Sequence, residues 1–574
     1  MSARRWVALA AAGALLLRLA LLVARGDYIV YDEGYYLLLA RSLAAGHGFR
    51  LNGLPHVALS PLQPLIVAGL SLVGVPDVWA SRLLAAACGA ALVFPVAWLA
   101  RRWGGEDAAA PAAVLAAAAP ALLTFAPFGP HEWNLYFGSE PLFLLLGLLA
   151  LVCAVRAVDE GAWRWWVLFG ALGALAYLTR LEGAVLGVAL GVAAAALLAV
   201  RGQRARLRRL VPAALVGLLV AAPYFAYLHS ALGRWAVSGR VQAAGAPVAA
   251  APPPATPGAA APAGQGDALQ QFVWGGDVAA LWRTLYALDP SGTRMASQYW
   301  GVAPRPTHAP AATAPPAAAA GAPPAVAAPD APDSLTAVPA APSMAVQLAR
   351  ALLTVVPWWL GALALVGLVM VRPRSDAFAW IGAVAVAVAV PAVFAYVEPR
   401  ALLLLTPVAC VCGGVAVAWG AARLPARARL PLAALGAAVL LVHPVRDLVR
   451  AWPQSTPLQR AATARRVVGE YLAEHLGAGA TIVSWHPALA VWAHRAWRVQ
   501  PYDDLPRILS YARAQGAAAV VLSTFEPSPL RNPPRAFTVV LVDSAAVAPG
   551  PNVRLDPVEE TPLVFVGRVA KAGP

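Results

Sequence analysis

Long apolar runs separated by arginines are the feature that most restricts how this chain can fold. Hydrophobic residues make up 60% of its 574 residues, and charged residues make up only 12%. A soluble domain usually carries about 25% charged residues, whereas a membrane span needs roughly 20 mostly apolar ones. The sequence therefore predicts an α-helical polytopic membrane protein.

The length of the apolar runs predicts about eleven spans. We expect them at 6–24, 78–100, 108–128, 138–157, 163–179, 183–200, 208–229, 349–371, 377–397, 400–421 and 428–445. The first run is long for the core of a cleaved signal peptide, so we expect it to be retained. Residues 61–75 are apolar but short and bounded by prolines, which favours a re-entrant or interfacial helix.

Arginines predict the orientation, because cytoplasmic loops carry an excess of Lys and Arg. If 61–75 does not cross, the arginine groups fall on the cytoplasmic side: Arg4/Arg5, Arg101/Arg102, Arg156/Arg164, Arg201 to Arg209, Arg372/Arg374 and Arg423 to Arg429. If it crossed, the run RGQRARLRR would be exported. We therefore expect a multi-pass protein of the cytoplasmic (inner) membrane, with its N-terminus inside, its C-terminus outside and its active site on the extracytoplasmic face.

The composition changes three times along the chain and predicts four regions. Residues 1–230 are expected to form a transmembrane catalytic module with a first extracytoplasmic loop at 25–60, and 349–445 a second transmembrane module. Between them, 231–348 is rich in Pro and Ala and is predicted to be largely disordered, apart from a helical island at 267–301.

The last region, 446–574, predicts a small extracytoplasmic α/β domain of a size normal for one core. Its helical segments 459–477 and 504–516 alternate with the strand-like segments 481–485, 517–523, 537–542 and 562–569.

The net charge of +15 would suggest nucleic-acid binding in a soluble protein. Here the arginines lie between apolar runs, and basic patches interleaved with exposed aromatics are missing, so we expect no nucleic-acid partner. The four cysteines all fall inside apolar runs and offer neither a zinc spacing nor a disulfide framework. We expect them to be small core residues.

The segment DYIVYDEGYYLLLARSLAAGHGF, residues 27–49, places the adjacent carboxylates Asp32 and Glu33 directly after the first span. An amphipathic interfacial helix is predicted to follow, with Gly46 and Gly48 as stops. Together with the re-entrant helix it would form a groove open to lipid and to water. Asp32 is then either a cap of this helix or a general base at the lipid–water boundary.

The order of several segments resembles the membrane glycosyltransferases of the C superfamily, and within them the protein mannosyltransferase and aminoarabinose transferase group. The segments are YDEGYYLLLARSLAAGHGF, SPLQPLIVAGLSLVG, ARRWGG, SEPLFLLLGLLAL, ALAYLTRLEGAVL and YVEPRALLLLTPV, within residues 1–445. The resemblance implies a GT-C-like fold and a polyprenyl-phosphate sugar as donor. It also implies that the acidic pair, here Asp32 and Glu33, belongs to the catalytic centre.

The implied reaction is an inverting transfer of a sugar to an extracytoplasmic lipid, glycan or protein. Such a transfer needs one base for the acceptor hydroxyl and cations for the departing phosphate. We expect Arg180, Arg400 and Arg18 to bind the donor phosphate, and Glu140, Glu182, Glu398 and His131 to bind substrate. The alternative for Arg180 is a salt bridge with Glu182, and for Arg18 simple snorkelling.

Two questions stay open at the level of sequence. His47, His56, His131 and Glu132 offer a divalent-cation site, but the adjacent Asp32 and Glu33 lack the Asp-X-Asp spacing of the metal-using branch, so no cofactor is expected to be obligatory. A transporter or flippase of lipid-linked sugars, or a glycan ligase, is the alternative function. Transporters often show internal repeats and broken helices at mid-membrane, and neither pattern is evident here.

Overall fold

The computed structural model describes residues 3–24, 29, 31–123, 138–239, 288, 344–372, 374–394, 399–425, 436, 442, 457–523, 537–542, 555–560 and 565–569. The predicted Pro/Ala tract, its island at 267–301 and the predicted span at 428–445 lie almost wholly outside them.

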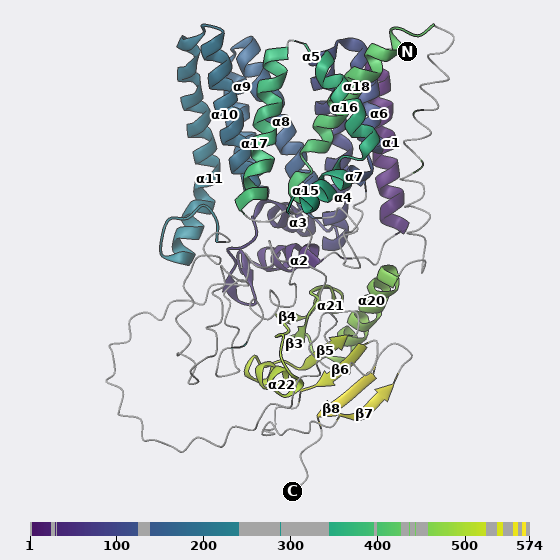
Figure 1. Ribbon diagram of the computed structural model, residues 1–574. Helices are drawn as coiled ribbons and strands as arrows, with labels where there is room; N and C mark the ends of the chain where they lie inside the picture. The colour runs from purple at the N-terminus through teal and green to yellow at the C-terminus, as the bar shows by residue number, and fades with distance from the viewer. Residues whose placement is uncertain are drawn as a thin grey trace, which may run out of the picture.

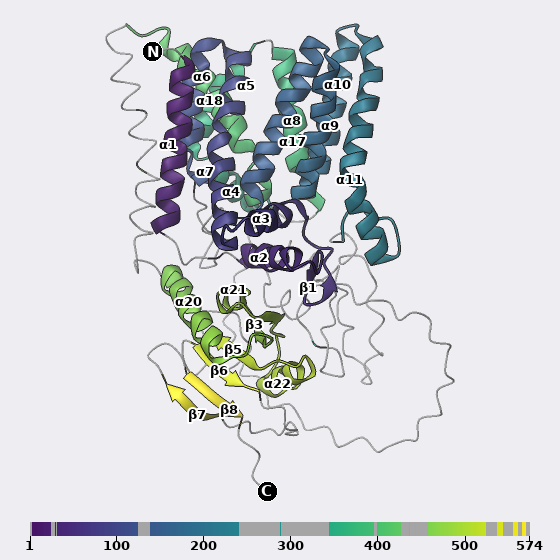
Figure 2. The ribbon, with the colours of Figure 1, turned by 180° about the vertical axis from the view of Figure 1, so that it is seen from behind.

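A bundle of apolar helices forms one half of the molecule (Figures 1 and 2). Its helices are α1 (Ala3–Ala24), α4 (Asp77–Ala91), α5 (Val93–Gly104), α6 (Glu106–Ala118), α7 (Pro120–Leu123), α8 (Glu140–Glu160), α9 (Trp163–Thr179), α10 (Glu182–Val200), α11 (Leu210–Leu232), α16 (Trp358–Met370), α17 (Arg374–Phe394) and α18 (Leu405–Ala421). Two 3-10 helices, η1 (Arg204–Arg209) and η2 (Pro399–Leu402), lie at its ends. Small side chains permit close packing: Gly413 and Gly414 of α18 face Leu115 and Ala112 of α6.

Five described helices or helix pairs are long and apolar enough to cross a membrane, and a sixth if a bent pair counts as one span. The five are Ala3–Val23, Asp77–Gly104, Glu140–Glu160, Glu182–Val200 and Arg204–Leu232. Each coincides with a predicted span, so the polytopic helical class is confirmed. The total of about eleven spans stays a prediction.

Residues 61–75 form α3 (Leu62–Leu72), a helix of 11 residues. At 1.5 Å per residue it is about 16 Å long, roughly half of what a span needs. Together with α2 (Tyr31–Ala44) it lies across the end of the bundle (Figure 1). This geometry agrees with the prediction that 61–75 does not cross.

The predicted span at 349–371 is broken by a bend in the structure. The chain forms α15 (Met344–Val355) and then α16, and the two axes meet at 83°. Pro357 stands at the break, where it lacks a backbone donor and restricts Val356 to extended conformations. The carbonyl of Val355 accepts instead from the buried Thr406 hydroxyl at 2.7 Å.

The predicted interfacial helix is α2, and other parts of the chain cover it. Leu37 and Ala40 pack with Val67, Ala68 and Val78 of α3 and α4. Tyr35, Tyr36 and Leu39 pack instead with residues from the C-terminal part of the chain. The helix is therefore covered on two sides. It ends as predicted, near Gly46 and Gly48, which have φ of +76° and +81°.

The described residues between 457 and 569 form a six-stranded sheet with helices on both faces, here termed the C-terminal unit. The strands are β3 (Thr481–Ser484), β4 (Ala496–Val499), β5 (Ala519–Ser523), β6 (Phe537–Leu541), β7 (Leu555–Glu560) and β8 (Phe565–Val569), in the order β4-β3-β5-β6-β8-β7. The strand β3 pairs in parallel with β4 and β5, and β6 with β8, whereas β5–β6 and β7–β8 are antiparallel.

Helices α20 (Pro457–His475) and α21 (Ala488–Ala493) pack on one face of this sheet, and α22 (Leu505–Ala514) packs on the other. The strands β3, β5, β6 and β8 lie where the sequence predicts strands, whereas α21, β4 and β7 were not predicted. A two-stranded hairpin, β1 (Arg50–Leu51) and β2 (Leu54–Pro55), precedes α3.

Candidate active site

Five charged side chains from distant parts of the chain meet at the end of the bundle beside α2. They are Asp32, Glu140, Arg180, Glu182 and Arg400, here termed the charge cluster. The turn between α9 and α10 supplies Arg180, and η2 supplies Arg400. All five were candidates from the sequence, and the structure brings them together.

Arg180 lies between two carboxylates. Its Nη1 donates to Glu140 Oε1 at 2.7 Å, and its Nη2 donates to Glu182 Oε1 at 2.9 Å. Burial lowers the pKa of the Arg180 guanidinium, but Glu182 and Glu140 together raise it by more, so the net direction is upward and the group stays charged. The predicted pair of Arg180 with Glu182 exists, and Glu140 extends it.

Arg400 pairs with Asp32 and also lies 4.0 Å from Glu140 Oε1. Glu140 therefore links the two arginines. The Asp32 side chain keeps 25% of its surface exposed, more than Glu140 with 11% or Glu182 with 20%. Asp32 is therefore the carboxylate of the charge cluster that a substrate reaches most readily.

Glu33 points elsewhere. It has no exposed surface and accepts a hydrogen bond from Ser81 Oγ of α4 at 3.3 Å. Neighbouring residues of a helix project about 100° apart, which here directs the two carboxylates to different neighbours. The two acidic residues therefore have different surroundings: Asp32 faces Arg400, and Glu33 faces α4.

The helix α2 begins at Tyr31, so Asp32 lies within its first turn rather than before it. A carboxylate there is still favourable, because the helix N-terminus carries partial positive charge. Its described partner is the Arg400 side chain, however. This placement weakens the interpretation of Asp32 as a helix cap.

Tyr36 and Ser139 belong to the same site, and sequence reasoning missed both. The Tyr36 hydroxyl donates to Ser139 Oγ at 3.0 Å, and Ser139 precedes Glu140. Burial raises the pKa of Tyr36 to about 12, and the charges of Asp32 and Glu140 add to this shift against the effect of Arg180. The spacing offered a signal, since Tyr36 follows Asp32 by four residues and shares its helix face.

Arg18 has its own partners in α1 and α7. Its guanidinium donates to the carbonyls of Ala14 at 3.0 Å and Leu122 at 2.9 Å. It also packs on Gly89 of α4, where a Cβ atom would collide with it. Within the described residues these are its hydrogen bonds, so the structure does not bring Arg18 into the charge cluster.

The other candidates divide into two groups. Glu398, His131 and Glu132 lie outside the described residues. His47 is exposed, whereas His56 is fully buried and its Nε2 accepts from the Leu59 amide at 3.1 Å. Among the residues that the structure covers, no three His, Cys, Asp or Glu side chains gather at a spacing suited to a metal ion.

Comparison with known proteins gives a family match and a fold match. Residues 60–227 match the family model of dolichyl-phosphate-mannose-protein mannosyltransferases. The crystal structure of ArnT from Cupriavidus metallidurans in the apo state superposes with a TM-score of 0.52 at 16% identity, covering 91% of this chain and 93% of ArnT. ArnT bound to undecaprenyl phosphate gives a TM-score of 0.50 at 17% identity, covering 90% and 93%.

The chain shares the fold of ArnT. The resemblance predicted from the sequence is therefore confirmed, and the family match agrees with the predicted enzyme class, a glycosyltransferase. The archaeal oligosaccharyltransferase AglB from Archaeoglobus fulgidus is a more distant match, with 12% identity and a TM-score of 0.46, covering 90% of this chain and 69% of AglB. No curated protein matches the chain.

The segment that matches the family model begins at α3 and ends in α11. It contains Glu140, Arg180 and Glu182, whereas Asp32 and Arg400 come from outside it. The charge cluster therefore joins the matched segment to the helix before it and to the second half of the bundle.

Proposed function

We propose that the protein is a membrane glycosyltransferase that moves a sugar from a polyprenyl-phosphate donor to an extracytoplasmic acceptor by an inverting mechanism. One observation carries this proposal: a GT-C bundle assembles an accessible carboxylate and two arginines at one end, between the bundle and the C-terminal unit. Inverting transfer needs this pairing of a base with cations.

Asp32 is the proposed base. It takes the proton of the acceptor hydroxyl while that oxygen attacks the anomeric carbon of the donor sugar. The new bond joins the acceptor oxygen to the anomeric carbon. The bond from that carbon to the phosphate oxygen breaks, and its electron pair leaves with the polyprenyl phosphate.

Arg400 and Arg180 are the proposed partners of the departing phosphate. Guanidinium groups bind phosphate oxygens with two parallel hydrogen bonds. A donor phosphate that binds Arg400 competes with Asp32 for the same guanidinium, so donor binding would leave the Asp32 carboxylate to face the acceptor. Glu140 and Glu182 hold Arg180 in place.

The remaining candidates receive narrower roles. We assign Glu33 a positioning role, because a carboxylate without exposed surface cannot touch a substrate. Arg18 is left out of the phosphate site, because its guanidinium is bound to two carbonyl oxygens. Glu398 and His131 stay proposed substrate-binding residues on the strength of the sequence alone.

We also propose that the active site lies on the extracytoplasmic face of the cytoplasmic membrane and that no cofactor is obligatory. Two guanidinium groups can stabilise the leaving phosphate without a metal ion. Transfer that stops with a chelator and returns with a divalent cation would contradict this part. The acceptor is an extracytoplasmic lipid, glycan or protein, and mass spectrometry of envelope glycans and lipids from a deletion strain would name it.

Purified protein incubated with isotopically labelled polyprenyl-phosphate sugars and an envelope extract provides the direct test. We expect label to move to an acceptor, with the anomeric configuration inverted in the product by NMR. A product of retained configuration would contradict the inverting mechanism. Translocation of the intact donor in vesicles without transfer would instead indicate a flippase, and transfer of whole glycans a ligase.

A further inference from the structure

The helix that carries Asp32 is held by α4 on one side. The Glu33 carboxylate accepts from Ser81 of α4, and Arg41, near the end of α2, forms an ion pair with Asp77 at the start of α4. These contacts lie at the two ends of α2. They fix the helix against the bundle but leave its opposite side open to another part of the molecule.

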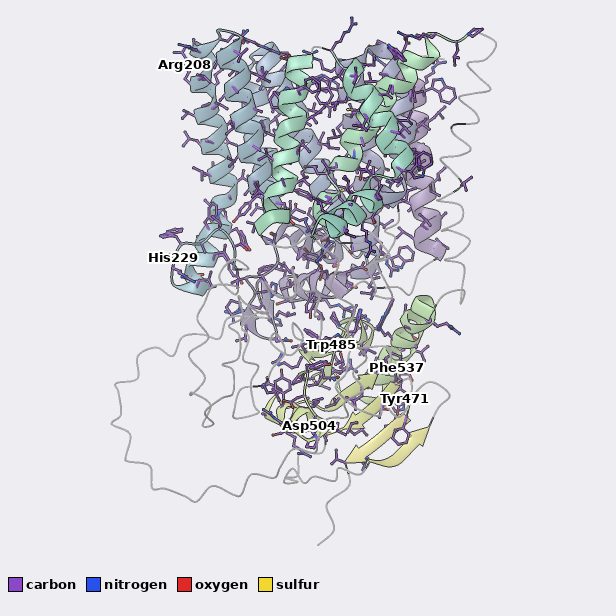
Figure 3. All side chains as sticks on the ribbon, in the orientation of Figure 1. Arg208, His229, Tyr471, Trp485, Asp504 and Phe537 are labelled. Carbon is purple, nitrogen blue, oxygen red and sulfur yellow. The ribbon has the colours of Figure 1, made fainter. Side chains whose placement is uncertain are left out.

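The C-terminal unit occupies that opposite side. Pro487, which precedes α21, lies so close to Gly34 that a Cβ atom there would come within 2.6 Å of the proline Cγ. The rings of Tyr35 and Trp497 meet edge to face at 5.2 Å. In Figure 3, Trp485 lies on the part of the C-terminal unit nearest to α2, whereas Asp504 lies on its far side.

Arg41 contacts both α4 and the C-terminal unit. Besides its pair with Asp77, its Nη1 donates to the carbonyl of Val491 in α21 at 2.8 Å. Apolar packing surrounds these polar contacts. Residues of the C-terminal unit share three buried clusters with helices of the bundle end. In the first, Trp485, Ala490, Trp497 and Val499 pack with α2. In the second, Ala488 and Val491 pack with α2, α3 and α4, and in the third, Ala462 packs with α1 and α4.

From this geometry we propose that the C-terminal unit is a positioning element of the active site: Pro487, seated on Gly34, holds α2 so that Asp32 stays beside Arg400. Gly34 follows Asp32 by two residues on the same short helix, so a shift of α2 at Gly34 moves Asp32 with it. This inference rests on the proposed function, in which Asp32 is the base. It assigns Gly34, Arg41 and Pro487 to positioning rather than to chemistry.

Glycine is required at position 34 because the proline ring is rigid and cannot give way as a long side chain would. Gly34→Ala should therefore push the C-terminal unit and α2 apart. A displacement of about 1 Å at a catalytic group can cost on the order of 10²-fold in rate. We expect kcat to fall between about tenfold and 10²-fold, with little change in the KM for the donor.

Gly69→Ala is the matched control. Gly69 lies in the neighbouring helix α3, is exposed, and has no atom within 4 Å of the position of an added Cβ. We expect this variant to keep the kcat and the unfolding temperature of the natural sequence. A kcat of Gly34→Ala equal to that of Gly69→Ala would overturn the proposal.

Rescue separates positioning from general loss of structure. Pro487→Gly removes the ring that meets position 34, and glycine is tolerated before a helix. The double variant Gly34→Ala/Pro487→Gly should regain most of the kcat that Gly34→Ala loses. If the loss in Gly34→Ala instead follows its unfolding temperature and disappears on cooling, the role is merely structural and the proposal is wrong.

Arg41→Lys offers a milder change should Gly34→Ala fail to fold. Lysine keeps a cation for Asp77 but lacks the planar guanidinium that serves Asp77 and Val491 together. We expect a severalfold lower kcat with an unchanged donor KM. An unchanged kcat in a variant whose α2 amides exchange faster would show that the contact does not position Asp32.

Hydrogen exchange distinguishes failure of this inference from failure of the proposed function. Amides of residues 31–44 should exchange faster in Gly34→Ala than in Gly69→Ala, whatever the substrate. If the natural protein transfers no sugar but this difference is present, the C-terminal unit holds α2 and the proposed function is wrong. If sugar is transferred and the exchange difference is absent, the positioning inference is wrong.

Discussion

At the scale of single residues, two neighbouring carboxylates have separate tasks because a helix turns them away from each other. Asp32 keeps a quarter of its surface exposed beside Arg400, and Glu33 is fully buried against α4. A substitution at Asp32 should therefore affect the reaction, and a substitution at Glu33 should affect the fold. This contrast can be measured.

Asp32→Asn is expected to abolish most activity without unfolding the protein. The amide keeps the size of the side chain but cannot accept a proton, so transfer should fall on the order of 10²-fold or more. The unfolding temperature should change little, because the side chain is only part-buried. Assays with the true donor and a thermal melt check both. An active Asn variant would leave Asp32 as no more than the ion partner of Arg400.

Glu33→Ala should show the reverse pattern. It removes the carboxylate that accepts from the buried Ser81 hydroxyl of α4, which costs about 1–3 kcal/mol. We expect a lower unfolding temperature and, at temperatures where the variant is folded, a loss of kcat much smaller than that of Asp32→Asn, because Glu33 helps to hold α2 but does not take the proton. Ser81→Ala is the matched control and should lose less. A kcat loss as large as that of Asp32→Asn would assign Glu33 to the chemistry.

Tyr36→Phe tests the hydrogen bond to Ser139. Below pH 10 the natural protein should be more stable than the variant by about 0.5–1.5 kcal/mol. Since folding raises the pKa of Tyr36 from 10.0 to about 12, the folded state keeps a proton that the unfolded state loses. The advantage should therefore shrink as pH rises from 10 toward 12. Thermal melts of both proteins between pH 8 and about 11 check this sign.

At the scale of elements, the break between α15 and α16 places the second arginine of the site. The helix α15 packs beside η2, which carries Arg400, and η2 leads directly into α18. The break leaves the last carbonyl of α15 without a partner in its own helix. The buried hydroxyl of Thr406, in the first turn of α18, supplies that partner.

Thr406→Val should destabilise this break. Valine has the shape of threonine but no donor, so the buried carbonyl of Val355 loses its bond at a cost of about 1–3 kcal/mol. Thr354→Val is the control, since Thr354 bonds within its own helix at an exposed position. We expect only Thr406→Val to lower the unfolding temperature clearly. It should also raise the KM for the donor, because a shift of α15 displaces the neighbouring η2 and with it Arg400. Equal melts for the two variants would contradict this account.

At the scale of the whole molecule, the two ends of the bundle differ: one is rich in arginine, and the C-terminal unit packs against the other. Figure 3 places Arg208, of the arginine-rich η1, at the end opposite to the C-terminal unit. At that same end Arg201 bonds Asp159 at 3.2 Å and pairs with Asp376, which ties α10 to α8 and α17. Such an end suits the cytoplasm, which supports the proposal that the charge cluster lies on the extracytoplasmic face.

Reporter fusions test this orientation. A fusion after residue 204 should report the cytoplasm, because an exported arginine cluster would violate the positive-inside rule. A fusion after residue 480, in the C-terminal unit, should report the outside. If residue 204 is exported, the orientation is reversed, and the assignment of α3 as a helix that does not cross must be reconsidered.

The sequence by itself determined the membrane class, the position of most helices and the GT-C resemblance. These depend on local properties: the length of an apolar run, the proline that bounds it and the arginines beside it. Each member of the charge cluster could also be nominated singly, because each stands at the predicted outer end of a span, within a segment that carries the resemblance.

Only the tertiary structure decided how these residues combine. Asp32 and Arg400 are 368 positions apart, and no local pattern encodes which arginine meets which carboxylate. The direction of Glu33, the part played by Tyr36 and Ser139, and the exclusion of Arg18 depend on the packing of α2, α4, α7 and α8. The contact between Pro487 and Gly34 joins residues from distant parts of the chain. Such contacts follow from shape complementarity and not from any periodicity in the sequence.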